Sequence, residues 1–299
     1  MTTRLLVLLT ALLLAPPARA EGPILGQRPT YTAAEPSVVP NARAIRTRIW
    51  VPGLDEGYVP QGLTFAEGQL LVSLYLSTDV NPDRGPSRVD RVDPSTGAVT
   101  GRFELPPDVG HPGGLAYAGG GVLYVADAGK LYRLDLPRAL ATGDGAAASL
   151  GRVAVEREMG PSFLAWDGRL LWFGRYLRSE TGRLWGVDPG AVFGPPPRTV
   201  TPAVAARSFD MAPIGQGATF DRGGRLWLSQ SNSRAGTLQE VDPATGRVLR
   251  EFALMPGLED LARAPDGALW SLSEAGSKRW LRWGTFYPLI FELDVRALR

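Results

Sequence analysis

The chain has 299 residues, no cysteine and one histidine, and its 32 basic and 30 acidic side chains give a net charge of +2. Without cysteine it can form no disulfide, thiolate metal site or cysteine nucleophile, and one histidine cannot form a zinc-binding histidine cluster. The length suits one large β domain.

The first 20 residues have the pattern of a cleaved secretory signal. Arg4 precedes an apolar run from Leu5 to Leu14, and Ala18-Arg19-Ala20 is a small-residue cleavage site. This run is too short to span a bilayer, and no later run is long enough, so we expect a secreted or periplasmic protein without a membrane span. Removal of the signal leaves equal numbers of basic and acidic side chains, so charge gives no reason to expect a nucleic-acid partner.

Residues 21–42 contain four prolines among glycine, alanine and serine, which is typical of an extended leader. We expect a single domain over residues 43–299.

Two sequence marks recur five times along this domain. The first is a short inner-strand pattern at residues 62–65, 114–117, 163–166, 217–220 and 260–263. The second is an aliphatic residue, two other residues, an aliphatic residue and an aspartate, which ends at Asp93, Asp135, Asp188, Asp242 and Asp294. Repeats of roughly 40–50 residues with four short strands each are typical of a β-propeller.

The two ends of the domain predict how the ring closes. Only five residues follow Asp294, too few for a fourth strand, while Ile45–Trp50 is an unpaired strand before the first repeat. We therefore predict an all-β, five-bladed β-propeller in which this N-terminal strand completes the last blade, leaving no open sheet edge there. Residues 137–151 and 190–210 are insertions, and we place the fourth strand of blade three near residues 198–204.

Polar residues before the inner strands and after the second strands should converge on one mouth of the central channel. Asp127, Glu259, Asp260 and Glu274 are candidate ligands for Ca²⁺, which prefers oxygen atoms. Alternatively, these acids form ion pairs centred on Arg175 that satisfy a buried channel, and we favour this interpretation. His111 is either a lone acid, base or ligand contact, or a structural loop histidine, which we also favour.

Residues 275–287 form a long loop in blade five that interleaves cations with aromatic rings. Such a loop either grips a sugar, a peptide or an anionic polymer, or folds as a lid with arginine stacked on tryptophan. The candidate ligand-binding residues of the whole face are Gln61, His111, Arg175, Gln216, Gln230, Lys278, Arg279, Trp280, Arg282 and Trp283.

Three features carry a resemblance to known families: the start Gln61-Gly62-Leu63, the turns Asp93-Pro94-Ser95-Thr96-Gly97 and Asp242-Pro243-Ala244-Thr245-Gly246, and the five-fold repeat. Over nearly all of the domain, the chain resembles exported bacterial propellers of the gluconolactonase-like and NHL-like superfamily. That resemblance implies a central divalent ion held by glutamate, aspartate and asparagine side chains. The chain is also similar, more narrowly, to plant-type glutaminyl cyclases, five-bladed propellers that share the Gln-Gly-Leu start.

Three functional hypotheses follow, and the third of them is a purely structural envelope protein. The leading one is a monomeric scaffold that binds a small molecule, a peptide or an envelope protein over the channel face, because the sequence shows no catalytic constellation. The alternative is an enzyme of lactonase, esterase or glutaminyl cyclase type, in which Ca²⁺ held by the central acids polarises a carbonyl.

Overall fold

The computed structural model describes residues 22–79, 85–195 and 199–299. The predicted secretory signal over residues 1–20 lies outside this part. None of the helices in the described ranges is both long enough and apolar enough to cross a membrane.

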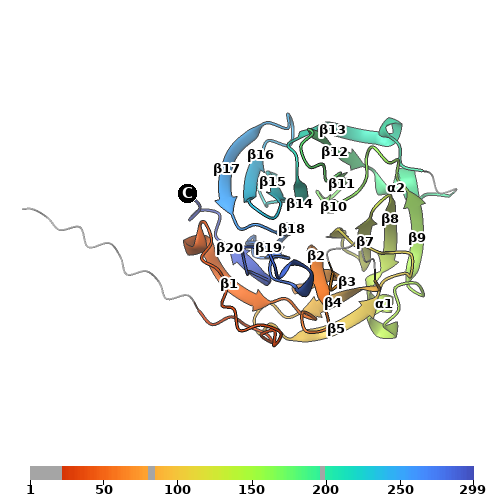
Figure 1. The fold of residues 1–299 in the computed structure, drawn as a ribbon. Coiled ribbons are helices and arrows are strands. Elements are labelled where there is room, and N and C mark those ends of the chain that lie inside the picture. The colour runs from red at the N-terminus through yellow and green to blue at the C-terminus, as the bar shows by residue number, and fades with distance from the viewer. Residues whose placement is uncertain (1–21, 80–84, 196–198) are drawn as a thin grey trace, which may run out of the picture.

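Five four-stranded antiparallel sheets stand around one axis as the blades of a propeller, which confirms the predicted fold (Figure 1). In each blade the strands follow one another from the axis outwards. Blade one contains β2 (Tyr58–Ala66), β3 (Gln69–Leu76), β4 (Ser87–Val92) and β5 (Val99–Glu104), and blade two contains β6 (Gly114–Tyr117), β7 (Val122–Asp127), β8 (Lys130–Asp135) and β9 (Ser149–Ala154). Blade three contains β10 (Phe163–Trp166), β11 (Leu171–Gly174), β12 (Gly182–Val187) and β13 (Ala205–Met211). Blade four contains β14 (Gly215–Phe220), β15 (Leu226–Ser231), β16 (Gly236–Val241) and β17 (Val248–Leu254). Blade five contains β18 (Leu258–Arg263), β19 (Leu269–Ser273), β20 (Leu289–Leu293) and β1 (Ile45–Trp50).

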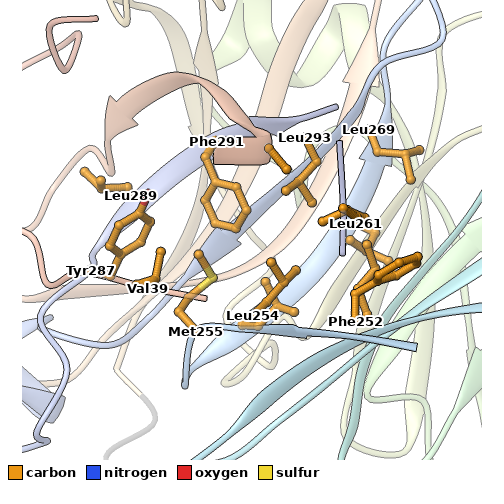
Figure 2. Packing of buried hydrophobic residues seen from close by; sticks show 14 of the residues in the cluster. Val39, Phe252, Leu254, Met255, Leu261, Leu269, Tyr287, Leu289, Phe291 and Leu293 are labelled. Atoms are coloured by element: carbon orange, nitrogen blue, oxygen red, sulfur yellow. The ribbon is translucent and has the colours of Figure 1, made fainter. Parts of the chain in front are cut away.

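The N-terminal strand closes the ring as predicted. Strand β1 pairs antiparallel with β20, with Ile49 opposite Ile290 and Trp50 opposite Leu289. A buried apolar cluster joins this closing blade to blade four and includes Phe252, Leu261 and Phe291 (Figure 2). The first and last segments of the domain are therefore held by both a strand ladder and a shared core.

Glycines at the start of the inner strands let neighbouring blades approach closely around the axis. A Cβ atom on Gly114 would lie 2.2 Å from the backbone nitrogen of Leu164, and one on Gly217 would lie 2.4 Å from the Cα atom of Asp260. Any larger residue would clash with the backbone of the next blade. This packing explains why glycine opens the inner-strand pattern in blades one, two and four.

The fourth strand of blade three is β13 (Ala205–Met211), so its predicted place near residues 198–204 is wrong. Arg198 lies outside the described residues, and Pro202–Val204 forms a short 3-10 helix, η2. Proline has no N–H to donate to a strand ladder, so pairing with β12 begins only after it. The sequence pattern did not indicate that the strand begins this late in the chain.

Both insertions contain a short helix. In α1 (Leu136–Thr142) and α2 (Pro189–Phe193), the aspartate that ends the third strand caps the helix with its side chain. Asp135 accepts from the backbone N–H of Arg138, and Asp188 accepts from that of Gly190. The aspartate mark of the repeat thus starts a helix in blades two and three and a tight turn in blades one and four.

Residues 22–41 form no helix or strand longer than an isolated bridge, but they pack on the propeller. Leu25 bridges Ile49 of β1, and the backbone N–H of Ser37 donates to the carbonyl of Phe286 at 2.8 Å. The hydroxyl of Tyr31 donates to the carbonyl of Gly276 at 2.5 Å. The leader therefore supports the long loop of blade five from outside.

Candidate functional site

A cavity of about 660 Å³ opens at one mouth of the central channel. All five blades contribute to its lining, through the approaches to inner strands and the loops after second strands. Loops on a rigid scaffold commonly carry binding residues in this way. Seven of the predicted site residues line the cavity: Gln61, His111, Gln216, Glu274, Arg279, Trp280 and Trp283.

The other predicted ligand-binding residues lie outside the lining. Within the described ranges, Arg175 forms none of the expected ion pairs with the four acids. Gln230 is buried and accepts from the hydroxyl of Thr237 at 3.1 Å. Lys278 donates to the carbonyl of Asp55 at 2.5 Å, and Arg282 is exposed.

Asp260, a predicted metal ligand, instead joins the inner strands of several blades. Its side chain is 0% exposed and accepts from the backbone N–H groups of Leu63 at 3.0 Å, Leu115 at 3.3 Å and Leu261 at 2.9 Å. Burial raises the pKa of Asp260, and these N–H groups, together with that of Ala218, oppose the rise. A carboxylate whose oxygens already bind backbone donors from several blades has a structural role.

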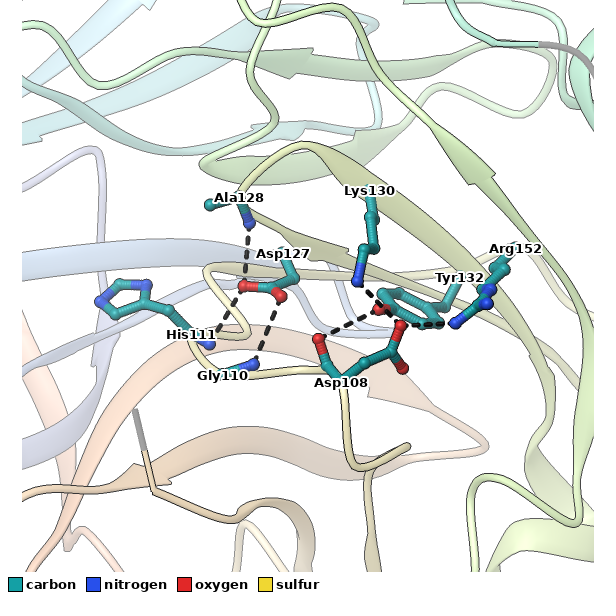
Figure 3. A network of polar contacts seen from close by, with 8 residues as sticks. All are labelled: Asp108, Gly110, His111, Asp127, Ala128, Lys130, Tyr132 and Arg152. Atoms are coloured by element: carbon teal, nitrogen blue, oxygen red, sulfur yellow. Dashed lines mark hydrogen bonds and ion pairs between the residues drawn. The ribbon is translucent and has the colours of Figure 1, made fainter. Parts of the chain in front are cut away.

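Asp127, another predicted metal ligand, holds the loop that presents His111. It accepts from the backbone N–H groups of His111 at 3.0 Å, Gly110 at 3.3 Å and Ala128 at 2.8 Å (Figure 3). Figure 3 shows the imidazole of His111 turned away from this carboxylate. Asp127 thus fixes the backbone while the imidazole reaches the cavity.

The loop before His111 is fixed at Asp108 as well. The Asp108 carboxylate accepts from Lys130 at 2.8 Å and Arg152 at 2.5 Å, and its carbonyl accepts from the hydroxyl of Tyr132 at 3.4 Å (Figure 3). These contacts and the backbone bonds to Asp127 hold residues 108–111 at both ends.

Glu259 and Glu274 form a hydrogen-bonded carboxyl pair beneath the cavity. Both residues are buried: Glu259 is 1% exposed and Glu274 is 7% exposed. Burial and the charge of Glu274 raise the pKa of Glu259 well above its usual range. Burial raises the pKa of Glu274 to about 7, against the bonds from Trp280 and Glu259 that lower it. Both carboxyl groups therefore keep protons at pH values where an exposed glutamate is ionised.

Amide and indole groups orient this pair. The side-chain amide of Gln61 donates to Glu274 at 3.1 Å, and that of Gln216 donates to Glu259 at 3.0 Å. The indole N–H of Trp280 donates to the same oxygen of Glu274 at 2.6 Å. Blades one, four and five thus meet at the two carboxyl groups, which fixes their geometry before any ligand binds.

A row of flat groups forms one wall of the cavity. The rings of His111 and Tyr75 are 4.6 Å apart, and those of Trp280 and Trp283 are stacked at 4.7 Å. Between them, the guanidinium of Arg279 lies 5.5 Å from the Tyr75 ring and 4.7 Å from the Trp280 ring. In residues 275–287, named the lid loop from here on, arginine is thus stacked on tryptophan, and the same rings face the cavity.

Several residues that line the cavity were not predicted from the sequence. They share a position just beyond the second strands of blades three and four, or just before β14. They are Tyr176, Arg178, Ile214, Asn232, Ser233 and Arg234. The prediction stopped at the expected strand ends, at Arg175 and Gln230. The loops run one to four residues further before they reach the cavity, and the unbroken polar run at residues 231–234 in blade four was the available signal.

The four predicted Ca²⁺ ligands do not share a site. Across residues 22–79, 85–195 and 199–299, no group of three or more histidine, cysteine, aspartate or glutamate side chains is arranged to hold a metal ion. Asp127 and Asp260 bind backbone N–H groups, and Glu259 and Glu274 bind each other. The donor set therefore does not fit the oxygen-rich cage that Ca²⁺ requires.

Comparison with known proteins gives similarity in structure alone. No protein-family model and no curated protein matches this chain. Its structure is similar to that of the Myxococcus xanthus glutaminyl cyclase, with a TM-score of 0.57 and 14% identity over 84% of this chain and 94% of the other. The likeness is one of fold.

Two further solved structures match less closely. The PQQ-bound aldose sugar dehydrogenase from Streptomyces coelicolor has a TM-score of 0.45 and 14% identity over 79% of this chain and 94% of the other. A protein described as a glucose dehydrogenase from Thermus thermophilus has a TM-score of 0.44 and 18% identity over 79% and 96%. At these identities, the comparisons concern the propeller fold and leave the activity to be inferred from the cavity.

Proposed function

We propose that this chain binds a small organic ligand in the cavity at the mouth of the central channel. The observation that carries the proposal is the convergence of loops from all five blades on one cavity of about 660 Å³. Small-molecule sites are typically concave, mostly apolar and supplied with a few oriented polar groups. The stacked wall and the oriented carboxyl pair provide both components.

The cavity is already organised for binding. Trp280 is fixed by its bond to Glu274, and Arg279 donates to the hydroxyl of Ser77 at 2.9 Å. Burial raises the pKa values of Tyr75 and Tyr176, so both lining hydroxyls stay neutral and can donate hydrogen bonds. A ligand therefore meets a wall whose side chains lose little freedom on binding.

Ligand-observed NMR with a fragment library tests this proposal. The exposed residue Ala128 lines the cavity, so Ala128→Trp fills it without removing a core contact. Ala141→Trp, on the exposed face of α1, is the matched control. We expect fragments that bind the wild type and the control to lose binding to Ala128→Trp. Binding that is equal in all three proteins, or no binding to the wild type, would refute the proposal.

We also infer that the chain acts outside the cytoplasm, on the support of the signal pattern in residues 1–20 alone. N-terminal sequencing of protein recovered from the periplasm or the medium should begin at Glu21. An intact N-terminus on protein retained in the cytoplasm would contradict this.

The carboxyl pair favours a second candidate function, an enzyme that moves a proton. A carboxyl with a pKa of about 7 at a cavity can give or take a proton at neutral pH, as Glu274 can. Because the fold resembles that of a glutaminyl cyclase, cyclisation of an N-terminal glutaminyl peptide is the reaction to test. There the α-amine would attack the side-chain amide carbon and ammonia would leave, with Glu274 accepting one proton and delivering it to the leaving nitrogen.

Ammonia release from a glutaminyl dipeptide measures this activity. We expect Glu274→Gln to abolish it and Glu158→Gln, an exposed control, to retain it. Absence of ammonia with the wild type, or equal rates with Glu274→Gln, would reject the enzyme and leave the binding proposal standing.

A further inference from the structure

Three arginines from consecutive blades line the cavity. Arg178 follows β11 in blade three, Arg234 lies between β15 and β16 in blade four, and Arg279 belongs to the 3-10 helix η3 (Lys278–Trp280) in blade five. Glu274 is the one acidic residue among the described lining residues. The lining therefore carries more positive than negative charge at neutral pH, whether or not Glu274 is ionised.

These arginines differ in what they already contact. Arg279 lies against Tyr75 and Trp280, and its charge acts on Glu274. Arg178 and Arg234 are exposed at the rim, and neither forms an ion pair with a described residue. The guanidinium groups of Arg178 and Arg234 are thus available to a ligand at the rim. The charge of Arg279, in contrast, already acts on the buried carboxyl group of Glu274.

The wall supplies the second part of the recognition. Trp280 and Trp283 are stacked on each other, half-buried, and both line the cavity. Flat apolar faces of aromatic or sugar rings pack favourably on tryptophan. Guanidinium groups bind carboxylate and phosphate oxygens in a planar, bidentate geometry.

We propose that the ligand of this cavity is an organic anion in which a ring with an apolar face carries a carboxylate or phosphate. The ring packs on Trp280 and Trp283, and the anionic group binds Arg178 and Arg234. This inference rests on the proposed binding function and names its ligand class. The ring is either aromatic or a sugar, and the two share the anionic group.

The test compares acids with their neutral amides, which have nearly the same shape. Indole-3-acetate against indole-3-acetamide probes the aromatic arm, and methyl glucuronoside against its amide probes the sugar arm. Calorimetric titration at low and high salt measures each dissociation constant. We expect the acid of at least one pair to bind about tenfold more tightly than its amide at low salt, a difference that falls as salt screens the charges.

A double variant shows whether these arginines cause the preference. In Arg178→Gln/Arg234→Gln, the acid and the amide should bind within about twofold of each other, with the affinity for the amide unchanged. Arg138→Gln/Arg169→Gln removes the same charge from exposed positions outside the cavity lining and should keep the wild-type preference. The pair that shows the effect identifies the ring.

Each other outcome overturns the inference. Equal binding of acid and amide, a preference that survives in the cavity variant, an equal loss in the control variant, or no binding by any of the four probes would each do so. The fragment experiment with Ala128→Trp separates this failure from that of the proposed function. Cavity-specific fragments without a preference for anions would leave the binding function in place.

Discussion

The indole N–H of Trp280 donates to Oε2 of Glu274 at 2.6 Å, and this bond joins the lid loop to the carboxyl pair beneath the cavity. The protonation state of Glu274 and the position of the wall are therefore linked. An ionised carboxylate is the stronger acceptor, so the lid is held most firmly when Glu274 carries its charge.

Replacing Trp280 with phenylalanine should raise the pKa of Glu274 above its value of about 7, because the bond from Trp280 lowers it. Carbon-13 NMR of labelled glutamate side chains, followed through a pH titration, measures this. Trp283→Phe, which changes the ring stacked on Trp280 and keeps the bond from Trp280 to Glu274, should leave the titration in place. A pKa that stays the same or falls in Trp280→Phe would contradict the linkage.

The carboxyl pair should make the folded chain less stable as pH rises. The pKa of Glu274 is raised from 4.5 to about 7 on folding, so the folded chain binds more protons than the unfolded chain between these values. This contribution is fully present below pH 4.5 and is lost as pH rises through about 7. Over that window, one proton corresponds to a slope of roughly 1.4 kcal/mol per pH unit.

Urea unfolding across this pH range checks the slope. Glu274→Gln should remove about one proton's share of it, and Glu158→Gln, on the exposed surface, should follow the wild type. Parallel curves for the wild type and Glu274→Gln would show that Glu274 does not hold the extra proton.

Asp260→Asn should destabilise the propeller by about 2–4 kcal/mol, because an amide places its own N–H groups against backbone donors that the carboxylate accepted. The donors of Leu63 and Leu115 belong to other blades, so the loss affects several sheets. Asp266→Asn, in an exposed turn of the same blade, is the control and should change the free energy of unfolding by less than about 1 kcal/mol. Equal midpoints of urea unfolding for the two variants would rule out the joining role of Asp260.

Ile49→Ala should weaken the closure of the ring. Ile49 is 0% exposed in β1 and pairs with Ile290, so truncation leaves a cavity at the closing ladder and costs about 2–4 kcal/mol. Val38→Ala is a suitable control because Val38 is 99% exposed. Differential scanning calorimetry should show a lower Tm for Ile49→Ala alone. An unchanged Tm would mean that the N-terminal strand adds little to stability.

The fold was largely predictable because its determinants are local. Inner strands need glycine where blades approach closely, as at Gly114, and turns need aspartate and glycine, so each blade repeats a visible pattern. The exception is the outer strand of blade three, which begins after the 3-10 helix that starts at Pro202 and so lies later in the chain than predicted.

The site was predictable only as a face. The repeat placed Gln61, His111, Gln216 and Glu274 at one mouth, and the structure brings all four to the cavity. The repeat did not reveal the hydrogen-bond partners of these residues, because a side chain's partner in the channel belongs to another blade. Residues 61 and 274 are far apart along the chain, yet their side chains are 3.1 Å apart.

The sequence by itself therefore determined the five blades, their closure and the end of the ring at which polar residues gather, because strand periodicity and turn chemistry act between near neighbours. Only the tertiary structure decided that Asp260 binds backbone N–H groups, that Glu259 and Glu274 form a carboxyl pair, and that Arg178 and Arg234 reach the rim. Those outcomes depend on burial and on distances between blades, which arise only when the ring has closed.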